Sequence, residues 1–582
     1  MEEILKRNLF EVENARNLSS FEIIKTFVPT KSFLRLLSSK NHIVLGARGS
    51  GKTELVRMLA HDHLVQFEDT RCKEIIRNKE FIGIYVPTRL EWVGGLQNKH
   101  WKTQDEAEAF FQWRLNISTC AAFLKTLRSC LDTYISNDGD RARVERNLAI
   151  NLYKTWIANN QSCETLSELH NFLEDVEHDK QAQLTQSRIT GKSIPTNQLL
   201  GVYFENELFF PLRRAITLVS RALSFPSQTM WLLCLDETEF LEEYHHKILN
   251  SHLRSYPGNL VFKITTMPYY HHTLNTNTNA SLSVGHDFEY IYIDRDPLET
   301  SSGNDGVDEF AKNLFNKRAG ESGGNYKWED IETLLGPSTL LDPKGSDWDA
   351  NSQMMLLLKK YANQKTRERA NRMAGTPEFK DQIARKLHGA LLLKKAVEET
   401  GGRSALDIYS GTKMSISCSD ANPRRLIRIF NLFISEASKQ ENLNQINKKR
   451  QTSLLIQFSN SSLSRVQSEP KYGHDLYKFL NTIGTFMQHN LHDDLIGTDQ
   501  ISSIEIDKSI TDKEWEVIKT AVGLGLLYPN INTNSSDQMP ERKGIFRLAY
   551  VLAPHFRILP RKGKSISISR IIPQLDMQFA ER

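Results

Sequence analysis

Short apolar runs separated by longer stretches of helical spacing predict the secondary structure of this chain. Residues 42–45, 81–88, 230–236, 259–266 and 289–294 are dense in β-branched and apolar side chains, as in buried strands. Between these runs, apolar residues recur every three or four positions, which is typical of helices packed by one face. Strands that alternate with helices predict an α/β fold with a parallel sheet covered on both sides.

Shifts in this pattern divide the chain into regions. Residues 1–40 form a helical lead-in, and residues 41–300 contain the five predicted strands. Within them, residues 89–228 have purely helical spacing and are interpreted as a helical insertion. Residues 301–440 are again helical, and residues 450–582 follow a polar linker as a compact C-terminal domain.

The C-terminal domain has the pattern of a winged helix. Helices are expected over 475–491 and 512–528, with a short strand over 501–507. Strands expected over 544–556 and 564–572 form a β-hairpin, the wing. The wing carries the positive charges Lys543, Arg547, Arg557, Arg561, Lys562 and Lys564. They suit DNA phosphates, and they equally suit a protein-binding domain with a solvated basic rim.

Composition narrows the class of protein. The chain has 582 residues and a net charge of +4, which argues against a bulk polycation. Its 6 cysteines are far apart and form no C-x-x-C pair, so a reducing cytoplasm is expected. The charged N-terminus lacks the apolar core of a signal peptide, and no apolar run is long enough to span a membrane.

A glycine-rich turn after the first predicted strand is the strongest chemical signal. The sequence GARGSGKT at 46–53 is G-x-x-x-x-G-K-[ST] between a strand and a helix, the arrangement of a phosphate-binding loop. Glycines let successive N–H groups point inward, and the helix start adds unpaired donors. Lys52 is expected on the β- and γ-phosphates and Thr53 on Mg²⁺. The loop residues expected to bind the nucleotide are Gly46, Ala47, Arg48, Gly49, Ser50, Gly51, Lys52 and Thr53.

Polar residues at the ends of later strands complete the predicted site. The strand at 230–236 ends in Asp236, expected to hold Mg²⁺, and Glu237, expected to polarise the attacking water. Thr265 and Thr266 end the next strand, where a hydroxyl can sense the γ-phosphate. Arg424 opens a helix in the sequence ANPRRLIRIF and can swing onto the γ-phosphate.

Together, GARGSGKT, LLCLDETEFL, FKITT and ANPRRLIRIF resemble an AAA+ ATPase of the origin-recognition and helicase-loader clade. The chain looks most like the bacterial origin-recognition-like ATPases found beside antiviral defence genes. The resemblance implies a sheet order of 5-1-4-3-2, a helical lid and oligomers with ATP between subunits. It makes residues 46–53 Walker A, Asp236 and Glu237 Walker B, Thr265 or Thr266 sensor 1 and Arg424 sensor 2.

Some positions fit this resemblance poorly. The insertion at 89–228 is longer than in a minimal loader, and neither Arg254 nor Arg295 is a convincing arginine finger. Phe27 and Val28 are candidates for the adenine pocket by position alone, and core packing explains them as well. Histidines follow Walker B at His245, His246, His252, His271 and His272, without the spacing of a metal motif.

The sequence supports three functions. The first is a cytoplasmic, homo-oligomeric ATPase with ATP and Mg²⁺, a switch in antiviral defence that acts with DNA or an effector protein such as a nuclease, away from membranes. The second is a DNA-binding replication initiator or helicase loader, in which nucleic acid is the principal ligand. The third is a scaffold that binds ATP for structure alone. In the first reading Glu237, Lys52, Thr266 and Arg424 are catalytic, and Thr53 and Asp236 hold the metal.

Overall fold

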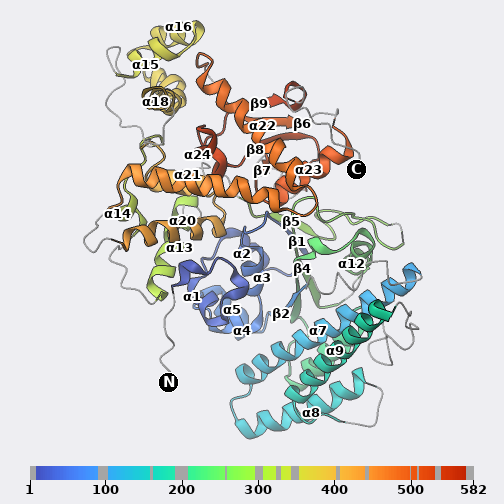
Figure 1. The fold of residues 1–582 in the computed structure, drawn as a ribbon. Helices are drawn as coiled ribbons and strands as arrows, with labels where there is room; N and C mark the ends of the chain where they lie inside the picture. Colours follow the sequence, from blue (N-terminus) through green and yellow to red (C-terminus); the bar gives the residue numbers. More distant parts are fainter. Residues whose placement is uncertain are drawn as a thin grey trace. The chain divides into compact units, whose positions relative to one another are not determined.

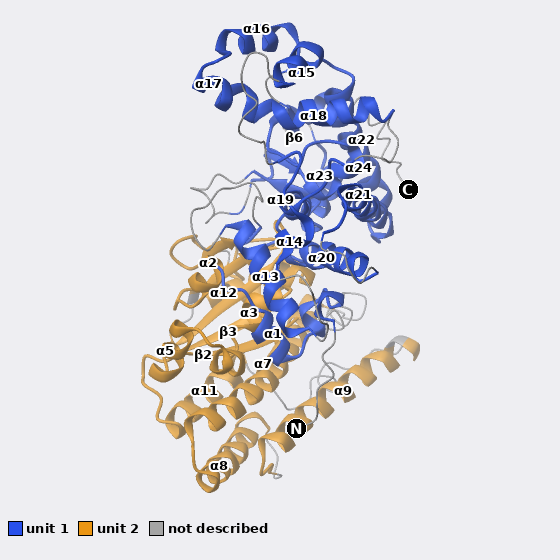
Figure 2. Ribbon diagram, turned by 90° about the vertical axis from the view of Figure 1, so that its left-hand side faces the viewer, with its two compact units in different colours: residues 1–30, 46–51, 293–582 blue, residues 31–45, 52–292 orange. Residues whose placement is uncertain are grey.

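The structure is a computed structural model with two compact units. It describes residues 8–88, 103–157, 162–190, 207–255, 258–278, 280–294, 306–322, 330–341, 353–401, 407–439, 445–497, 500–506, 510–530, 539 and 541–571. The first unit contains Met1–Thr30, Gly46–Gly51 and Ile293–Arg582, and the second contains Lys31–Leu45 and Lys52–Tyr292 (Figure 2). The glycine-rich loop thus groups with the C-terminal half of the chain.

A parallel sheet forms the centre of the second unit (Figure 1). Its strands are β1 (His42–Leu45), β2 (Phe81–Pro87), β3 (Met230–Asp236), β4 (Leu260–Thr266) and β5 (Glu289–Tyr292). They lie in the order β2-β3-β4-β1-β5, and every pair is parallel. This confirms both the predicted α/β class and the 5-1-4-3-2 order.

The register places the ends of the central strands at one edge of this sheet. Leu45 of β1 pairs with Thr266 of β4, and Leu235 of β3 pairs with Ile264 of β4. Asp236 follows Leu235 by one residue and Thr266 follows Ile264 by two residues. Both therefore end their strands at the same edge of the sheet. Ligands of open parallel sheets bind at this carboxyl edge.

Helices cover the sheet in the second unit. They are α2 (Lys31–Leu36), α3 (Lys52–Arg57), α4 (His61–Gln66), α5 (Thr70–Asn78) and α12 (Glu243–Ser255). The insertion supplies α7 (Gln104–Tyr134), α8 (Asp138–Trp156), α9 (Leu166–Thr190) and α11 (Phe210–Ala222). The described part of the insertion is mainly helical, and its α7 packs on the sheet through Phe123, whose ring lies 5.5 Å from that of Trp231. No described helix is long and apolar enough to cross a membrane.

The first unit is mostly helical outside its own sheet. Its helices are α1 (Ser20–Thr26), α13 (Val307–Glu321), α14 (Ile331–Leu335), α15 (Gln353–Tyr361), α16 (Gln364–Met373), α17 (Pro377–Phe379), α18 (Arg385–Glu399), α19 (Thr412–Cys418), α20 (Pro423–Ala437), α21 (Lys448–Ser464), α22 (Gly473–His492), α23 (Asp512–Gly523) and α24 (Ala553–Phe556). Phe10 near the N-terminus joins α13 and α20, because its ring lies 5.5 Å from Phe315 and 6.4 Å from Phe430.

A second sheet closes the C-terminal part of the first unit, and it differs from the prediction. Its strands are β6 (Ile501–Ile506), β7 (Leu527–Pro529), β8 (Gly544–Leu548) and β9 (Lys564–Ser567), in the order β7-β8-β6-β9. The hairpin predicted from β8 and β9 is wrong, since both strands pair with β6. The antiparallel pair of strands that are consecutive in sequence is β7 and β8. The winged helix stays a prediction.

Two element lengths in this domain also differ from the prediction. The helix expected to 528 ends at Gly523, because Gly525 takes a φ of 69° and the chain then enters β7. The strand expected to 556 ends at Leu548. The backbone N–H groups of Tyr550 and Val551 donate to the Asp420 carboxylate, which removes them from any strand ladder.

Candidate functional site

The glycine-rich loop has the backbone of a phosphate cradle. Gly49 and Gly51 take φ values of 86° and 95°, a region that side chains with a Cβ rarely enter. The helix α3 then begins at Lys52, as the pattern predicted. Lys52 is 6% exposed, so its side chain is packed against the protein rather than extended into solvent. Thr53 follows in the first turn of α3.

Protein acceptors hold the first part of the loop. Ala47 N–H donates to the Asp294 carboxylate at 2.8 Å, and Arg48 N–H donates to the Gly523 carbonyl at 2.7 Å. Both acceptors belong to the first unit, as the loop does. The loop is therefore held in shape by the C-terminal half of the chain. Asp294 and Gly523 carry no sequence signal that would have assigned them this role.

The turn that precedes α20 packs directly against the loop. Asn422 caps α20 by accepting from Arg425 N–H, and its side-chain amide donates to the Arg48 carbonyl at 3.1 Å. Arg424 N–H donates to the Gly49 carbonyl at 3.3 Å. A Cβ on Gly49 would lie 2.9 Å from the Arg424 Cβ and 2.9 Å from Asn422 Oδ1. The predicted sensor 2 arginine thus touches the loop through its backbone.

The Arg424 side chain stands in a cationic environment. Burial lowers the pKa of its guanidinium, and the nearby charges of Arg48 and Arg428 lower it further, while Glu13 acts in the opposite direction. Among the residues that the structure describes, no carboxylate forms an ion pair with Arg424. A half-buried guanidinium beside two others is stabilised by an added anion, which suits a phosphate.

At the edge of the parallel sheet, two hydroxyl groups orient the Asp236 carboxylate. Asp236 is 0% exposed; Thr265 donates to its Oδ1 at 2.5 Å and Tyr85 donates to its Oδ2 at 3.0 Å. The Thr265 hydroxyl also accepts from Glu237 N–H at 2.9 Å. Glu237 has a φ of 63°, so the backbone turns sharply after β3 and directs this residue away from the strand. Sequence reasoning missed Tyr85, because its partner lies on a neighbouring strand.

Of the two threonines at the end of β4, Thr266 has the free hydroxyl. Its Oγ1 is buried without a hydrogen-bond partner among the described residues, whereas Thr265 is bound to Asp236. A buried polar group without a partner is costly unless a ligand satisfies it. This supports the choice of Thr266 as the residue that faces the nucleotide.

Taken unit by unit, these residues suit the parts of a magnesium nucleotide: the acidic edge of the parallel sheet in the second unit suits the metal, and the loop and the turn in the first unit suit the phosphates. Asp236 is buried with hydroxyl partners and no cation in contact among the described residues, so its charge is available to a hydrated metal ion. The loop supplies glycines at positive φ, and Arg424 supplies positive charge that no described carboxylate meets in an ion pair. Thr53 and Asp236 would hold Mg²⁺, and the loop with Lys52 would hold the phosphates.

Asp420 is the residue of this region that sequence reasoning overlooked. It is a fully buried carboxylate that accepts from Arg425 at 2.9 Å and Arg547 at 2.8 Å. It also accepts from the backbone N–H groups of Tyr550 at 2.8 Å and Val551 at 3.0 Å. The turn before α20 thereby joins the C-terminal sheet. The position of Asp420, two residues before Asn422, is a weak signal in the sequence. The neighbouring residues do not predict its partners, because Arg547, Tyr550 and Val551 lie far along the chain.

Arg547 corrects the prediction for the basic wing. Its side chain is buried, ion-paired with Asp420 and stacked 3.8 Å from the centre of the Tyr550 ring. It is therefore unable to contact DNA phosphates in this structure. Lys543, Lys562 and Lys564 are exposed.

The structure also shows where the candidates for the arginine finger and the adenine pocket lie. Arg254 on α12 donates to the Ser281 carbonyl at 2.5 Å, and Arg295 lies outside the described residues. Phe27 is 3% exposed, as a core residue is, and Val28 is half-buried.

The histidines after Walker B pack in the second unit. Burial lowers the pKa of His245 to about 3 and that of His271 to about 4, so both are neutral at pH 7. The rings of His246 and His271 pack at a tilt, with their centres 4.6 Å apart. Within the described ranges, no three His, Cys, Asp or Glu side chains are grouped as in a preformed metal site.

Comparison with known proteins identifies the family. The family model of ORC-CDC6-like proteins matches residues 8–568, nearly the whole chain. No curated protein matches the chain. The match agrees with the order of the parallel sheet and with the positions of the glycine-rich loop, Asp236 and the turn before α20. The chain therefore belongs to the ORC-CDC6-like family, the AAA+ proteins of origin-recognition type.

Proposed function

We propose that this protein binds and hydrolyses ATP and that the nucleotide state controls the lid and the C-terminal domain. The carrying observation is the buried Asp236 carboxylate, which two hydroxyls orient and no described cation neutralises. A buried, ionised carboxylate is costly in a folded protein unless a cation neutralises its charge. An Mg²⁺ ion next to a phosphate-binding loop is the cation that this family and this motif imply.

Each residue of the site has a role in this proposal. The loop N–H groups and Lys52 bind the phosphates, and Thr53 with Asp236 positions the metal. Glu237 orients water for in-line attack, while Thr266 holds that water or the γ-phosphate. Arg424 balances charge on the γ-phosphate. Bound Mg²⁺ would neutralise charge on the β- and γ-phosphates.

The switch would run through the turn before α20. Asn422 and Arg424 bind the loop carbonyls, and Asp420 in the same turn binds Arg547 and the backbone of 550–551. A change at the loop on binding or loss of the γ-phosphate would move this turn. The buried ion pair between Asp420 and Arg547 on β8, together with the hydrogen bonds to 550–551, attaches the C-terminal sheet to the turn, so the sheet would follow.

The test compares Glu237→Gln with the wild type in ATP binding and in single-turnover hydrolysis. The variant should bind ATP as tightly as the wild type and hydrolyse it at least about a hundredfold more slowly, as loss of a general base implies. Glu243→Gln, the same change at an exposed site on α12, is the control and should leave both unchanged. Lys52→Ala should abolish binding. Equal hydrolysis by Glu237→Gln and wild type would refute the role of Glu237.

Membership in the ORC-CDC6-like family favours a second candidate, a DNA-binding initiator or helicase loader. In that case DNA affinity should depend on ATP and fall steeply with salt. A switch without a nucleic-acid ligand should show no DNA binding. A structural ATP scaffold would release no phosphate even with DNA and partner proteins present.

The cellular role we propose is antiviral defence, with a co-encoded effector such as a nuclease. It rests on the resemblance to origin-recognition-like ATPases found beside defence genes. Phage plating on cells with the wild type or with Glu237→Gln tests it. Equal plaque counts with and without the gene, in the presence of its neighbours, would contradict it.

A further inference from the structure

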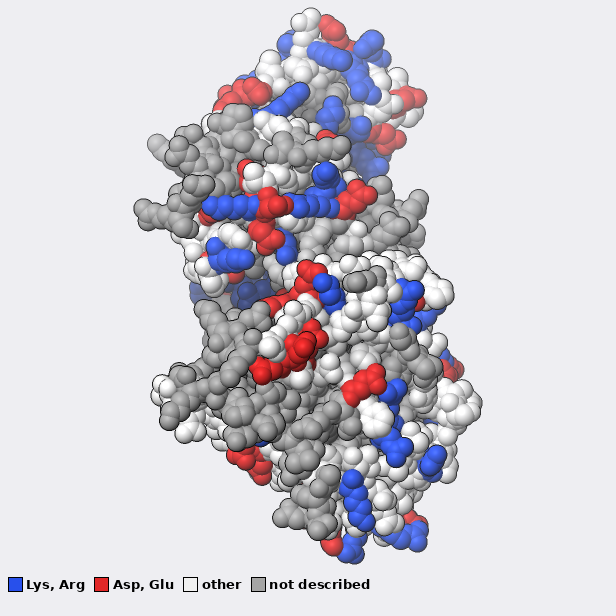
Figure 3. Space-filling view, turned by 90° about the vertical axis from the view of Figure 1, so that its right-hand side faces the viewer, with Lys and Arg blue, Asp and Glu red and all other residues white. Residues whose placement is uncertain are grey.

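The lid helices α15 to α18 have a charge unlike that of the rest of the chain. Residues 353–399 contain eleven Lys and Arg against five Asp and Glu, a net charge of +6. Since the whole chain carries +4, all other residues together sum to −2. Figure 3 shows many Lys and Arg, with Asp and Glu among them, at the top of the view, at the height of α15, α16 and α18 in Figure 1.

Most of these cations have no acidic partner. Nine of the eleven form no ion pair with any residue that the structure describes, whereas Lys360 pairs with Glu398 and Lys395 with Glu399. Two of the nine are held by neutral acceptors, since Arg369 donates to Gln382 and Lys394 donates to backbone carbonyls, which leaves seven with neither kind of partner among the described residues. These seven are Lys359, Lys365, Arg367, Arg372, Lys380, Arg385 and Lys386. Nearly all are exposed. Unpaired cations repel one another, so this concentration costs stability unless an anion neutralises it.

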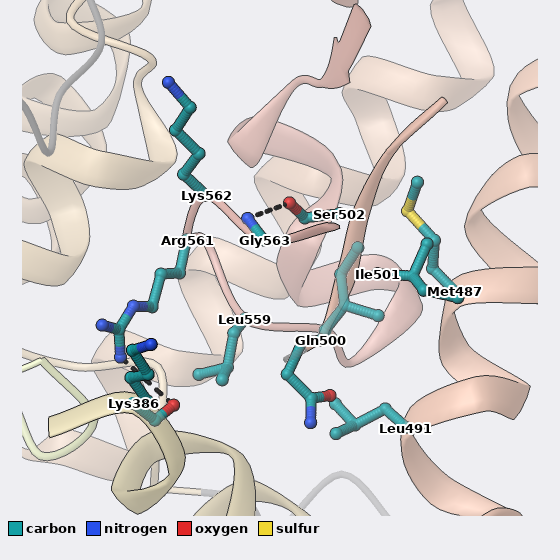
Figure 4. A pocket seen from close by; sticks show the side chains of 11 residues that line it. Lys386, Met487, Leu491, Gln500, Ile501, Ser502, Leu559, Arg561, Lys562 and Gly563 are labelled. Carbon is teal, nitrogen blue, oxygen red and sulfur yellow. Dashed lines mark hydrogen bonds between the residues drawn. The ribbon is translucent and has the colours of Figure 1, made fainter. Parts of the chain in front are cut away.

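A cavity joins this helical region to the C-terminal domain (Figure 4). It has a volume of about 130 Å³, far above the ~10–15 Å³ that one water needs. Its charged lining residues are Lys386, Arg561 and Lys562, without a carboxylate among them. The floor is apolar, with Leu559, Ile501 and Met487, and Gln500 and Ser502 add polar groups.

Arg561 is the fixed charge in this cavity. Its guanidinium donates to the carbonyls of Arg385 and Lys386 at the start of α18, directly after the π-helical turn Lys380–Ala384. Burial and the neighbouring charge of Arg385 lower the pKa of Arg561. Tyr550 acts in the opposite direction, but no carboxylate of the described residues forms an ion pair with Arg561, so an anion in the cavity would stabilise its charge. The π-helical turn, an irregularity common at functional sites, lies at this position.

The arrangement selects among polyanions. An anionic membrane would need an exposed apolar face for insertion, and of the large exposed apolar residues only Leu356 lies on α15 to α18. The cations are instead spread over α15 to α18 and the loop 559–564, which suits a ligand whose negative charges repeat at regular intervals. Nucleic acid has one phosphate about every 1.7 Å of duplex axis.

We infer that α15 to α18 and the loop 559–564 form a surface that binds the phosphate backbone of nucleic acid, with one phosphate in the cavity beside Arg561. We name this surface the lid cationic face; it comprises Lys359, Lys365, Arg367, Arg372, Lys380, Arg385, Lys386, Arg561 and Lys562. It shares Arg561 and Lys562 with the wing that the sequence predicted, but most of its charge lies on α15 to α18, and it does not require ATP hydrolysis.

The test is fluorescence anisotropy of a labelled duplex of about 20 base pairs at several salt concentrations, with the full chain free of nucleotide. Two variants remove exposed charge from separate parts of the face: Lys365→Ala/Arg372→Ala on α16 and Lys386→Ala/Lys562→Ala at the cavity. Each should weaken binding about tenfold or more near 0.1 M salt and reduce the slope of log K against log salt by about 2.

Matched controls separate this face from general charge. Lys448→Ala/Lys449→Ala removes two exposed lysines at the start of α21 and should change affinity less than twofold. Lys52→Ala should bind duplex as the wild type does, so failure of the ATP proposal leaves this result intact. Thermal unfolding checks that each variant is folded.

Four results would overturn the inference. They are no duplex binding at about 50 mM salt, unchanged affinity in both face variants, loss of affinity only in Lys543→Ala at the predicted wing, or equal binding to poly-glutamate or phosphatidylserine vesicles. The last result would assign the face to an acidic protein or a membrane.

Discussion

Asp236 and Asp420 are both buried aspartates with no exposed side-chain surface, yet their partners differ completely. Asp236 accepts from the hydroxyls of Tyr85 and Thr265, which carry no charge. Asp420 accepts from the guanidiniums of Arg425 and Arg547 and from two backbone N–H groups. The carboxylate of Asp236 thus has no ion-pair partner among the described residues, whereas that of Asp420 is neutralised within the fold.

This difference shows how to tell a binding carboxylate from a structural one. A buried charge needs a counter-charge, and the chain supplies it at Asp420 but not at Asp236. Removing the charge should therefore affect stability at one position and chemistry at the other. The predictions below separate these effects, from the largest to the smallest.

Asp236→Asn should have the largest effect, and it should fall on activity. The amide keeps an acceptor for one hydroxyl but loses the charge that, in our proposal, holds Mg²⁺, a contribution worth several kcal/mol in the transition state. We expect ATP hydrolysis to fall at least about a thousandfold. The free energy of unfolding without nucleotide should stay within about 1 kcal/mol of wild type, or rise. A large loss of stability would place Asp236 in the fold rather than the site.

Asp420→Asn should show the opposite balance. The variant leaves the buried guanidiniums of Arg425 and Arg547 without a counter-charge, which costs about 3–5 kcal/mol. Chemical denaturation of the first unit, followed by tryptophan fluorescence, measures this loss. ATP binding at a temperature where the variant is folded should persist. If Asp420→Asn were as stable as Asp236→Asn, the two carboxylates would not differ in their contribution to stability, and this prediction would be wrong.

Acid should destabilise the second unit through its neutral histidines. Burial lowers the pKa of His61 to about 4. Between pH 6.5 and 4 the unfolded chain therefore binds a proton that the folded chain does not, and stability falls as the pH falls through this window. Below about pH 4 the loss from this group levels off. We expect up to about 2 kcal/mol from His61 between pH 6.5 and 5.

His61→Gln should flatten this dependence. Glutamine does not titrate, and it can keep one of the bonds that His61 makes to the hydroxyls of Ser129 and Tyr134. Thermal unfolding at pH values from 7 to 4.5 gives the comparison. An unchanged pH profile in this variant would show that other groups cause the acid sensitivity.

Tyr85→Phe should have the smallest effect. It removes one of the two hydroxyls that orient Asp236 but leaves the charge, at a cost of about 1 kcal/mol. Hydrolysis should slow about fivefold, with little change in ATP affinity. Tyr85 acts as a positioning residue, so raising the Mg²⁺ concentration should restore part of the rate. No recovery with Mg²⁺ would indicate a packing defect instead.

The sequence predicted the parallel sheet well because each of its strands is an uninterrupted apolar run. The run at 42–45, followed by GARGSGKT, gave β1, the loop and α3 at the residues observed. The helix predicted in ANPRRLIRIF begins at Pro423 as α20, and its start is equally local, because the capping bond of Asn422 joins residues three positions apart. Where neighbours in sequence decide the structure, the pattern was sufficient.

The C-terminal sheet and Asp420 depend on contacts far along the chain. β9 joins β6 rather than β8, and the strand at β8 stops where Asp420, more than a hundred residues earlier, binds Tyr550 N–H. The same contact buries Arg547, which alone looked like a DNA-binding charge. Tyr85 could not be assigned either, since only the pairing of β2 with β3 brings it to Asp236.

The most direct test of the central claim is the Mg²⁺ dependence of ATP affinity, measured by isothermal titration calorimetry on wild type and Asp236→Asn with a hydrolysis-resistant ATP analogue. The account predicts that Mg²⁺ tightens binding to the wild type at least about tenfold and binding to Asp236→Asn less than twofold. Equal Mg²⁺ dependence in the two proteins would contradict it.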